Sequence, residues 1–151
     1  MPFTPSDYAE LRARLLGVPV LLTDAAADDS DKTFIVPAGK TWDIMGIWVE
    51  MSTVVTVGAR QISVQIQDDA AAVVAEIAAG ATQIALLARK YWFAPHLPDL
   101  TAFRAGDLLM TPLAPLTLPA GFVVRVYDAA VIAAAADDMT VRMLVGQRAP
   151  G

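Results

Sequence analysis

The chain contains no cysteine and only one histidine among its 151 residues. Without cysteine it forms no disulfides, binds no metal through thiolates and performs no thiol redox chemistry. His96, between Pro95 and Pro98, has no companion histidine or cysteine with which to hold zinc or iron. It is also the only imidazole that could activate a serine, and no serine lies in a Gly-x-Ser-x-Gly elbow. We therefore expect no catalytic site, no metal, no cofactor and no enzymatic activity.

Charge and long apolar runs are also scarce. Only 18% of residues are charged, the formal net charge is −5 and the sequence pI is about 4.6, which argues against a broad basic surface for nucleic acid. Uncharged stretches such as 77–88 and 129–136 are shorter than the ~20 residues of a membrane-spanning helix. The N-terminus lacks the basic start and apolar run of a secretory signal. We expect no nucleic-acid partner and no membrane segment.

What the chain has in excess is apolar surface. Hydrophobic residues make up 56% of the sequence and the mean hydropathy is +0.49. A chain of this length forms a single domain with a core of its own, but a lone monomer would have difficulty burying so much apolar area. The surplus predicts contacts between subunits, and hence a homo-oligomer.

Two similar segments predict an all-β fold. Residues 34–39 and 116–121 both end in Pro-Ala-Gly, and a further strand pattern follows each one. Proline presets the first corner of a turn and glycine accepts a positive φ at its end, so both segments are predicted to be reversals between strands. Clean alternation in 61–67 indicates a half-buried strand, whereas 42–49 is apolar on both faces and is expected to be central or covered by a partner. The predicted strands lie near 33–37, 41–51, 53–57, 60–67, 72–78, 83–93, 108–111, 115–118, 121–128 and 139–146.

Residues 4–17 are the one convincing helix. Thr4 suits the cap, Pro5 the first turn, and Gly17 a left-handed end. Tyr8, Leu11 and Leu15 share one face of this helix, which can lie on its own sandwich or on a neighbouring subunit or partner. We therefore divide the chain into an N-terminal helical arm, 1–17, and a single β-sandwich domain of jelly-roll type, 18–151.

Several other segments bear on function. The acidic stretch 23–31 is predicted to be an exposed turn. Its carboxylates could supply oxygen ligands to calcium, but it lacks the spacing of an EF-hand loop, so calcium binding stays open. Residues 94–106 have no period and are the best candidate for a long projecting loop. The alanine-rich pieces 70–81 and 129–136 are expected to be short strands or loops. In 89–93 a strand would place Lys90 and Trp92 on one face and Arg89, Tyr91 and Phe93 on the other, as at the rim of a subunit contact.

Four runs together resemble a known family. Residues 36–44, 57–64, 89–95 and 118–126 are similar to the small β-sandwich proteins of tailed-phage virions, and most of all to the jelly-roll head proteins that cement or decorate the capsid. The likeness covers about residues 33–146. It implies a non-enzymatic virion structural protein, located on the capsid surface, that binds the outside of the major capsid protein shell as a homo-oligomer, typically a trimer.

Two other functions remain open beside the cement protein. One is a tail, neck or baseplate component. The other is a carbohydrate-binding module, which usually displays tryptophans on a sandwich face; here Trp42 and Trp48 share strand parity with Ile44, which predicts burial. Candidate interface residues are apolar or aromatic side chains of the arm and the predicted loops: Tyr8, Leu11, Leu15, Trp92, Phe93, Leu97 and Phe103.

Overall fold

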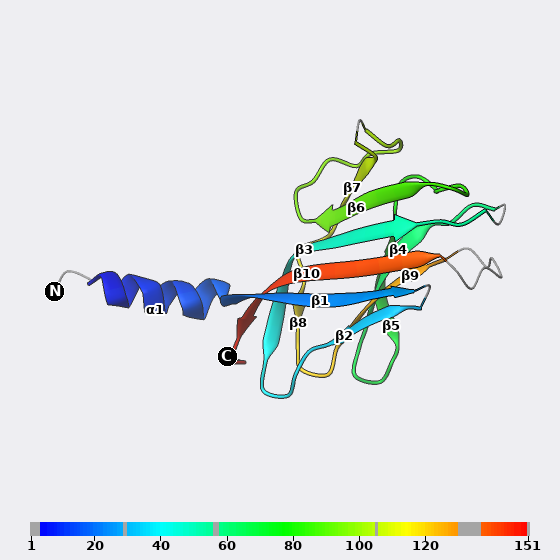
Figure 1. Cartoon of the computed structure of the whole chain (residues 1–151). Coiled ribbons are helices and arrows are strands. Elements are labelled where there is room, and N and C mark those ends of the chain that lie inside the picture. Colours follow the sequence, from blue (N-terminus) through cyan, green and yellow to red (C-terminus); the bar gives the residue numbers. More distant parts are fainter. Residues whose placement is uncertain (1–3, 29, 56–57, 105, 130–136, 151) are drawn as a thin grey trace.

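The computed structural model describes residues 4–28, 30–55, 58–104, 106–129 and 137–150. It is an all-β sandwich of two sheets, preceded by one helix, α1 (Pro5–Leu16) (Figure 1). None of the described helical structure is long and apolar enough to cross a membrane. The larger sheet contains β1 (Val18–Asp28), β10 (Asp138–Arg148), β3 (Thr41–Ser52), β6 (Ala88–Ala94), β7 (Leu108–Pro112) and β8 (Thr117–Leu118). The smaller sheet contains β2 (Lys32–Ile35), β9 (Val123–Asp128), β4 (Ile62–Gln67) and β5 (Val73–Ala78).

The strand order is that of a jelly roll. The larger sheet runs β1-β10-β3-β6-β7, with β8 pairing to β3, and the smaller sheet runs β2-β9-β4-β5. Early and late strands alternate in each sheet, as in two interlocked Greek keys. β7 is added parallel to β6, whereas the other strand pairs are antiparallel. The predicted all-β, jelly-roll-like class is confirmed.

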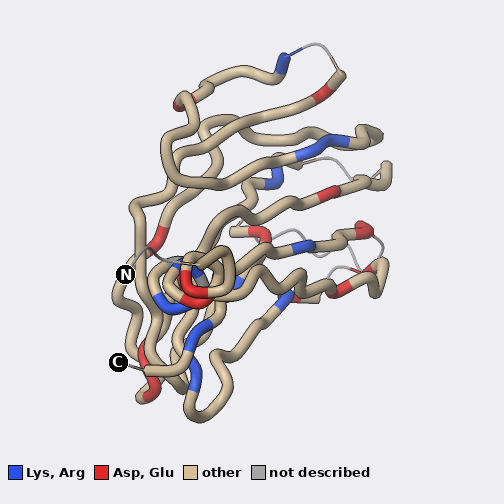
Figure 2. Tube along the Cα trace, turned by 90° about the vertical axis from the view of Figure 1, so that its left-hand side faces the viewer, with Lys and Arg blue, Asp and Glu red and all other residues tan. Residues whose placement is uncertain are grey.

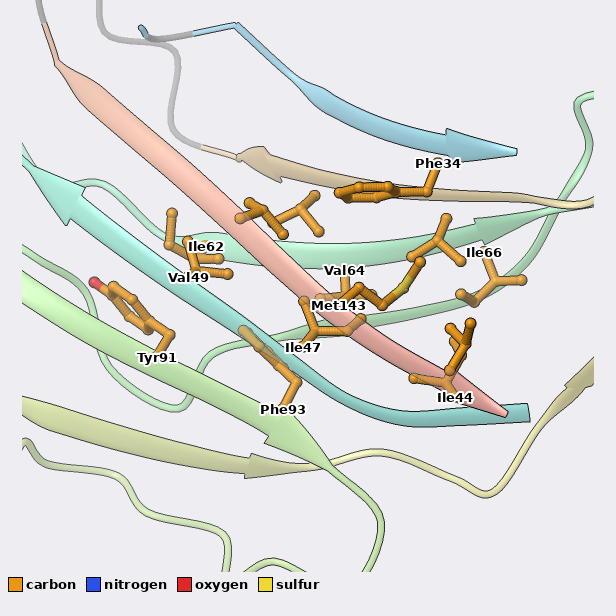
Figure 3. Packing of buried hydrophobic residues seen from close by; sticks show 14 of the residues in the cluster. Phe34, Ile44, Ile47, Val49, Ile62, Val64, Ile66, Tyr91, Phe93 and Met143 are labelled. Carbon is orange, nitrogen blue, oxygen red and sulfur yellow. The ribbon is translucent and has the colours of Figure 1, made fainter. Parts of the chain in front are cut away.

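The core lies between the inner faces of the two sheets (Figure 3). From the larger sheet, Ile47, Phe93 and Met143 are fully buried, and they meet Ile62 and Val64 of the smaller sheet. In β3 and β10 these side chains alternate with more exposed neighbours, which is the pattern of a half-buried strand. β4 differs from the half-buried strand predicted there, because its outward-facing Ser63 and Gln65 are buried as well.

The two Pro-Ala-Gly segments form the predicted reversals, and they lie side by side. Gly39 and Gly121 have φ of +68° and +87°, values that side chains rarely allow. The amide of Gly121 donates to the carbonyl of Val36 at 3.0 Å, and the amide of Val36 donates to the carbonyl of Phe122 at 2.9 Å. The sequence repeat is therefore a pair of hydrogen-bonded turns at one end of the sandwich.

Three predicted segments differ from the structure. Thr53–Val55 belongs to no strand. The amide of Thr53 donates to the carbonyl of Leu87 at 2.8 Å, and its hydroxyl donates to the carbonyl of Ile84 at 2.8 Å, beside the turn that interrupts the opposite segment. The predicted strand 83–93 begins only at Ala88, after a turn in which Leu86 has φ of +59°. The acidic stretch predicted as a turn is largely strand, since β1 continues to Asp28. Within 70–81 the structure has β5, as expected, while 130–136 lie outside the described residues.

Buried polar groups close the end of the sandwich that lies away from α1. The Arg60 guanidinium, fully buried, donates from Nε to Oδ2 of Asp137 at 2.7 Å and from Nη2 to Oδ1 at 3.2 Å. Oδ1 of Asp137 also accepts from the amide of Val54 at 2.9 Å. Beside this pair, Gln83 accepts from the Tyr91 hydroxyl at 2.9 Å. Burial raises the pKa of Tyr91 well above its usual value. This network ties together the ends of strands that are distant in sequence.

Candidate interaction surface

The arm α1 begins with a reciprocal cap. The amide of Asp7 donates to Oγ1 of Thr4 at 3.2 Å, and the amide of Thr4 donates to Oδ2 of Asp7 at 2.7 Å. This is a capping box with an aspartate in the third helical position, and the Thr4 hydroxyl also holds the pKa of Asp7 below its usual value. Glu10 and Arg14, one turn apart, form an ion pair at 2.6 Å. Local sequence thus builds the helix without help from the sandwich.

The apolar side of α1 is displayed. Tyr8, Leu11 and Leu15 are 62%, 45% and 63% exposed, and α1 projects away from the sandwich as a continuation of β1 (Figure 1). Gly17 alone joins the two elements, with φ of +73°. A Cβ there would stand 2.8 Å from the backbone of β10, at Gln147. The position therefore admits only glycine, in both its backbone conformation and the space beside it.

A β-bulge changes which tryptophans the larger sheet displays. β3 and β10 pair as Ile44 with Val145 and then Gly46 with Leu144, so Met45 is an extra residue. After this bulge the inward side chains are Ile47 and Val49, in place of the positions that simple alternation predicts. Trp42 is buried as expected, but the prediction that Trp48 shares its inward face is wrong. Trp48 faces outward.

The outer face of the larger sheet carries an apolar strip that crosses five strands. Trp48 and Trp92 are register neighbours whose ring centroids lie 6.2 Å apart at a tilt of 57°. The Trp92 indole lies over Gly46, where a Cβ would approach its Nε1 to 3.2 Å. Leu21 is 62% exposed, and Leu144, opposite it, is 37% exposed. We call the following residues the outer strip: Leu21, Leu144, Met45, Trp48, Trp92 and Met110.

Charged residues border the outer strip. Arg142 is paired with Trp48 across β10 and β3, and Lys90 precedes Trp92 by two residues on the same face of β6. Glu50 accepts a hydrogen bond from the Trp48 indole at 3.2 Å. Among the described residues, neither Arg142 nor Lys90 belongs to an ion pair. Figure 2, which looks along α1, shows how sparse charge is over the rest of the chain.

The outer face of the smaller sheet has a different chemistry. Arg125 donates to Asp31 at 2.5 Å, and its guanidinium lies 4.2 Å from the centre of the Tyr127 ring. The Tyr127 hydroxyl hydrogen-bonds to Glu76, which also accepts from Gln65 at 3.1 Å. These bonds lower the pKa of Glu76, with the Tyr127 contact the largest cause, and raise that of Tyr127. Hydrogen-bonded charged and polar side chains therefore characterise this face, whereas the outer strip is apolar.

The remaining interface candidates lie elsewhere. Phe93 is fully buried in the core, so it offers no surface to a partner and we leave it out of the interaction surface. Phe103 packs edge-on against Tyr91, with ring centroids 5.5 Å apart, and holds the long 94–106 connection against the core. Leu97 is half-buried in that connection, and His96 is exposed there. The alternation in 89–93 predicts that Trp92 faces outward. That Trp48 lies beside it follows only from the bulge at Met45, which the structure shows.

The acidic stretch is neutralised from within the chain. The Lys32 ammonium, fully buried, lies 2.5 Å from Oδ1 of Asp28 and 3.7 Å from Oδ1 of Asp24, and it donates to the carbonyl of Ala26 at 2.8 Å. It thus occupies the place that a cation would take among these oxygens. In the described part of the chain, no three acidic or histidine side chains group closely enough to hold a metal ion.

Acid is expected to weaken the Lys32–Asp28 contact. The hydrogen bond from Lys32, followed by those from Ser30, lowers the pKa of Asp28 to about 2 in the folded chain, against 3.8 ordinarily. A depressed pKa stabilises the fold above pH 3.8, and this contribution disappears as the pH falls towards 2. Asp28→Asn should therefore lower the unfolding free energy at pH 5 and make little difference at pH 2. Urea denaturation at pH 5 and at pH 2 measures this difference in unfolding free energy.

The Lys32→Met background supplies the control for that experiment. There, Asp28→Asn should lose most of its pH-dependent effect, because the lysine is the main cause of the lowered pKa. A difference between wild type and Asp28→Asn that is the same at pH 5 and pH 2 would contradict the assignment.

A small cavity lies between the two sheets. Its volume is about 130 Å³, and apolar side chains of β3, β4, β5 and the 113–116 segment form most of its wall. Glu76 is the one ionisable residue in the lining. The cavity therefore provides no pair of acid and base groups with which to perform catalysis.

No protein-family model and no curated protein sequence matches the chain. Among solved structures it is similar to a protein of the T13 IBDV viral particle, with a TM-score of 0.40 and 10% identity over 84% of this chain. It is also similar to a protein of the infectious bursal disease virus Gx strain, with a TM-score of 0.37 and 14% identity over 89% of this chain. The aligned parts are 31% and 33% of those chains. Similarity this low carries no argument about function.

Proposed function

We propose that the protein is a non-enzymatic structural component of a virion, a cement or decoration protein that binds the outside of the major capsid protein shell as a homo-oligomer, a trimer. The observation that carries the proposal is the pair of displayed apolar surfaces, the outer strip and the exposed side of α1, on a rigid jelly roll. Contiguous apolar patches on the surface of a protein typically mark interaction sites. The capsid surface is its proposed location.

Three features of the molecule support an assembly role. The outer face of the larger sheet carries two neighbouring tryptophans, whereas that of the smaller sheet carries a hydrogen-bonded network of charged and polar groups beside exposed Ile35 and Val74. The arm is built to be ordered while projecting, with a cap at its start and a tight joint at its end. The single exposed histidine and the missing cysteines leave little means of catalysis.

Virion stoichiometry tests this proposal. Purified particles of the virus whose genome encodes this chain would be analysed by quantitative mass spectrometry, with the major capsid protein as the internal standard. A cement protein should be present in numbers comparable to the capsid protein, and it should be released by dissociation of the outer shell layer. A copy number far below that of the capsid protein would favour a tail, neck or baseplate component, and absence from the particle would refute the proposal.

A carbohydrate-binding module is the second candidate, because Trp48 and Trp92 lie together on a sheet face. Tryptophan rings with nearby hydrogen-bonding groups, here Glu50, Lys90 and Arg142, form a surface on which sugar rings can stack. A glycan array probed with folded protein separates the two functions. Binding that disappears in Trp48→Ala would favour the module, and silence across the array would remove it.

A further inference from the structure

We propose that the arm α1 of one copy lies across the outer strip of a second copy, so that copies join arm to face. This inference rests on the proposed function, because it specifies how the homo-oligomer is held together. It follows from two surfaces of the same chain that are both exposed and both apolar.

The apolar side of α1 is not covered by its own sandwich. An isolated helix of 12 residues is marginal in water, and burial of its apolar side normally stabilises it. Gly17 is the only residue between α1 and β1, and α1 projects from the sandwich as a continuation of β1 (Figure 1). Tyr8, Leu11 and Leu15 therefore remain exposed until another molecule covers them.

The outer strip fits this occupant in size. It runs from β1 to β7 across four interstrand spacings of about 4.8 Å, roughly 19 Å in all. The 12 residues of α1, at about 1.5 Å each, give a rod of about 18 Å. A helix of this length crosses the sheet without overhanging it, and its apolar side chains, from Tyr8 to Leu15, span roughly 10 Å and cover the middle of the strip.

The charges also match. Asp7 lies one helical turn before Leu11 and so borders the apolar side of the arm. On the sheet, Arg142 and Lys90 border the outer strip and belong to none of the ion pairs formed by the described residues. Lys90 already faces Glu50 across β3 and β6, so docking of α1 on the strip gives Arg142 an acidic neighbour in Asp7.

The contact is heterologous, since each copy gives an arm and receives one. Heterologous contacts close into rings when the rotation between copies permits it. Arm exchange therefore accounts for a closed trimer with a single kind of interface, in which every arm and every outer strip is covered.

Cysteine cross-linking tests the proposal directly, because the natural chain contains no cysteine. Full-length Leu11→Cys and Leu144→Cys chains, distinguished by mass tags, would be mixed, allowed to exchange and oxidised. We expect a disulfide between the two different chains at least tenfold more abundant than in either control mixture. The controls move one cysteine away from the contact: Ser6→Cys, on the opposite side of the helix, with Leu144→Cys, and Leu11→Cys with Thr33→Cys on the smaller sheet.

Light scattering of the wild-type chain completes the test. An oligomer that cross-links no more in the test mixture than in the controls would overturn the proposal, as would a monomer at every concentration. The assay contains no capsid, so its failure is distinct from that of the proposed function. A chain that bound shells without arm exchange would refute only this inference, whereas arm exchange in a protein absent from virions would refute only the cement role.

Discussion

Phe93→Ala is expected to lower the free energy of unfolding by about 3–5 kcal/mol, because Phe93 is fully buried between the two sheets and its loss leaves a cavity. Figure 3 shows its ring among Ile47, Val64 and Met143. The backbone of β6 is fixed on both sides by β3 and β7, so the site has little freedom to collapse. Urea or guanidinium denaturation measures the change.

The adjacent residue provides the matched control. Trp92→Ala removes a larger ring from the outer face of the same strand, and we expect it to cost about 1 kcal/mol or less in stability. Its effect should fall on association, where a central tryptophan is commonly worth about 2 kcal/mol or more. Sedimentation of both variants below their unfolding transitions separates the effects. Equal loss of stability in the two variants would contradict the assignment of inner and outer faces.

Asp137→Ala is expected to destabilise the chain by about 3–5 kcal/mol. The change leaves the fully buried Arg60 guanidinium without its carboxylate, and an uncompensated buried charge is costly. It also removes the acceptor for the amide of Val54. The expected measurement is a lower denaturation midpoint at unchanged denaturant dependence.

A double variant distinguishes charge burial from simple loss of contacts. Arg60→Met combined with Asp137→Leu removes both charges and keeps much of the volume, so it should recover most of the stability lost in Asp137→Ala. If the double variant were less stable than Asp137→Ala by a further 2 kcal/mol or more, the pair would be stabilising in its own right.

The helix and most of the strands could be predicted because their signals are local. The cap at Thr4 and the Pro-Ala-Gly turns act over a few residues, and each is found where it was expected. The inward side chains of β4 were also predicted, but the burial of its outer face was not. The extent of β1 could not be predicted in this way. Its acidic end is held by Lys32 and by register with β10, and neither contact is visible in the residues of that stretch alone.

Trp48 shows the same limit in the candidate site. Strand parity is reliable only until an extra residue enters the ladder, and Met45 has no feature of its own that marks it as a bulge. The signal that could have found it is the pair Ile47 and Val49, which continue an apolar alternation out of phase with Trp42 and Ile44. The outer strip follows from that single shift, whereas the projection of α1 depends on the crowding of Gly17 by β10.

The position of β10 sets the order in which a growing chain can complete its architecture. β10 lies between β1 and β3, so β1 has no sheet neighbour until a strand made much later has been synthesised. Ribosomes build the chain from the arm onward, and pairings between such distant segments form slowly. The outer strip needs Leu144 of β10 to join Leu21 to the tryptophans. A nascent chain therefore exposes its arm before its outer strip is complete. Subunit association through the strip is delayed until β10 has been translated.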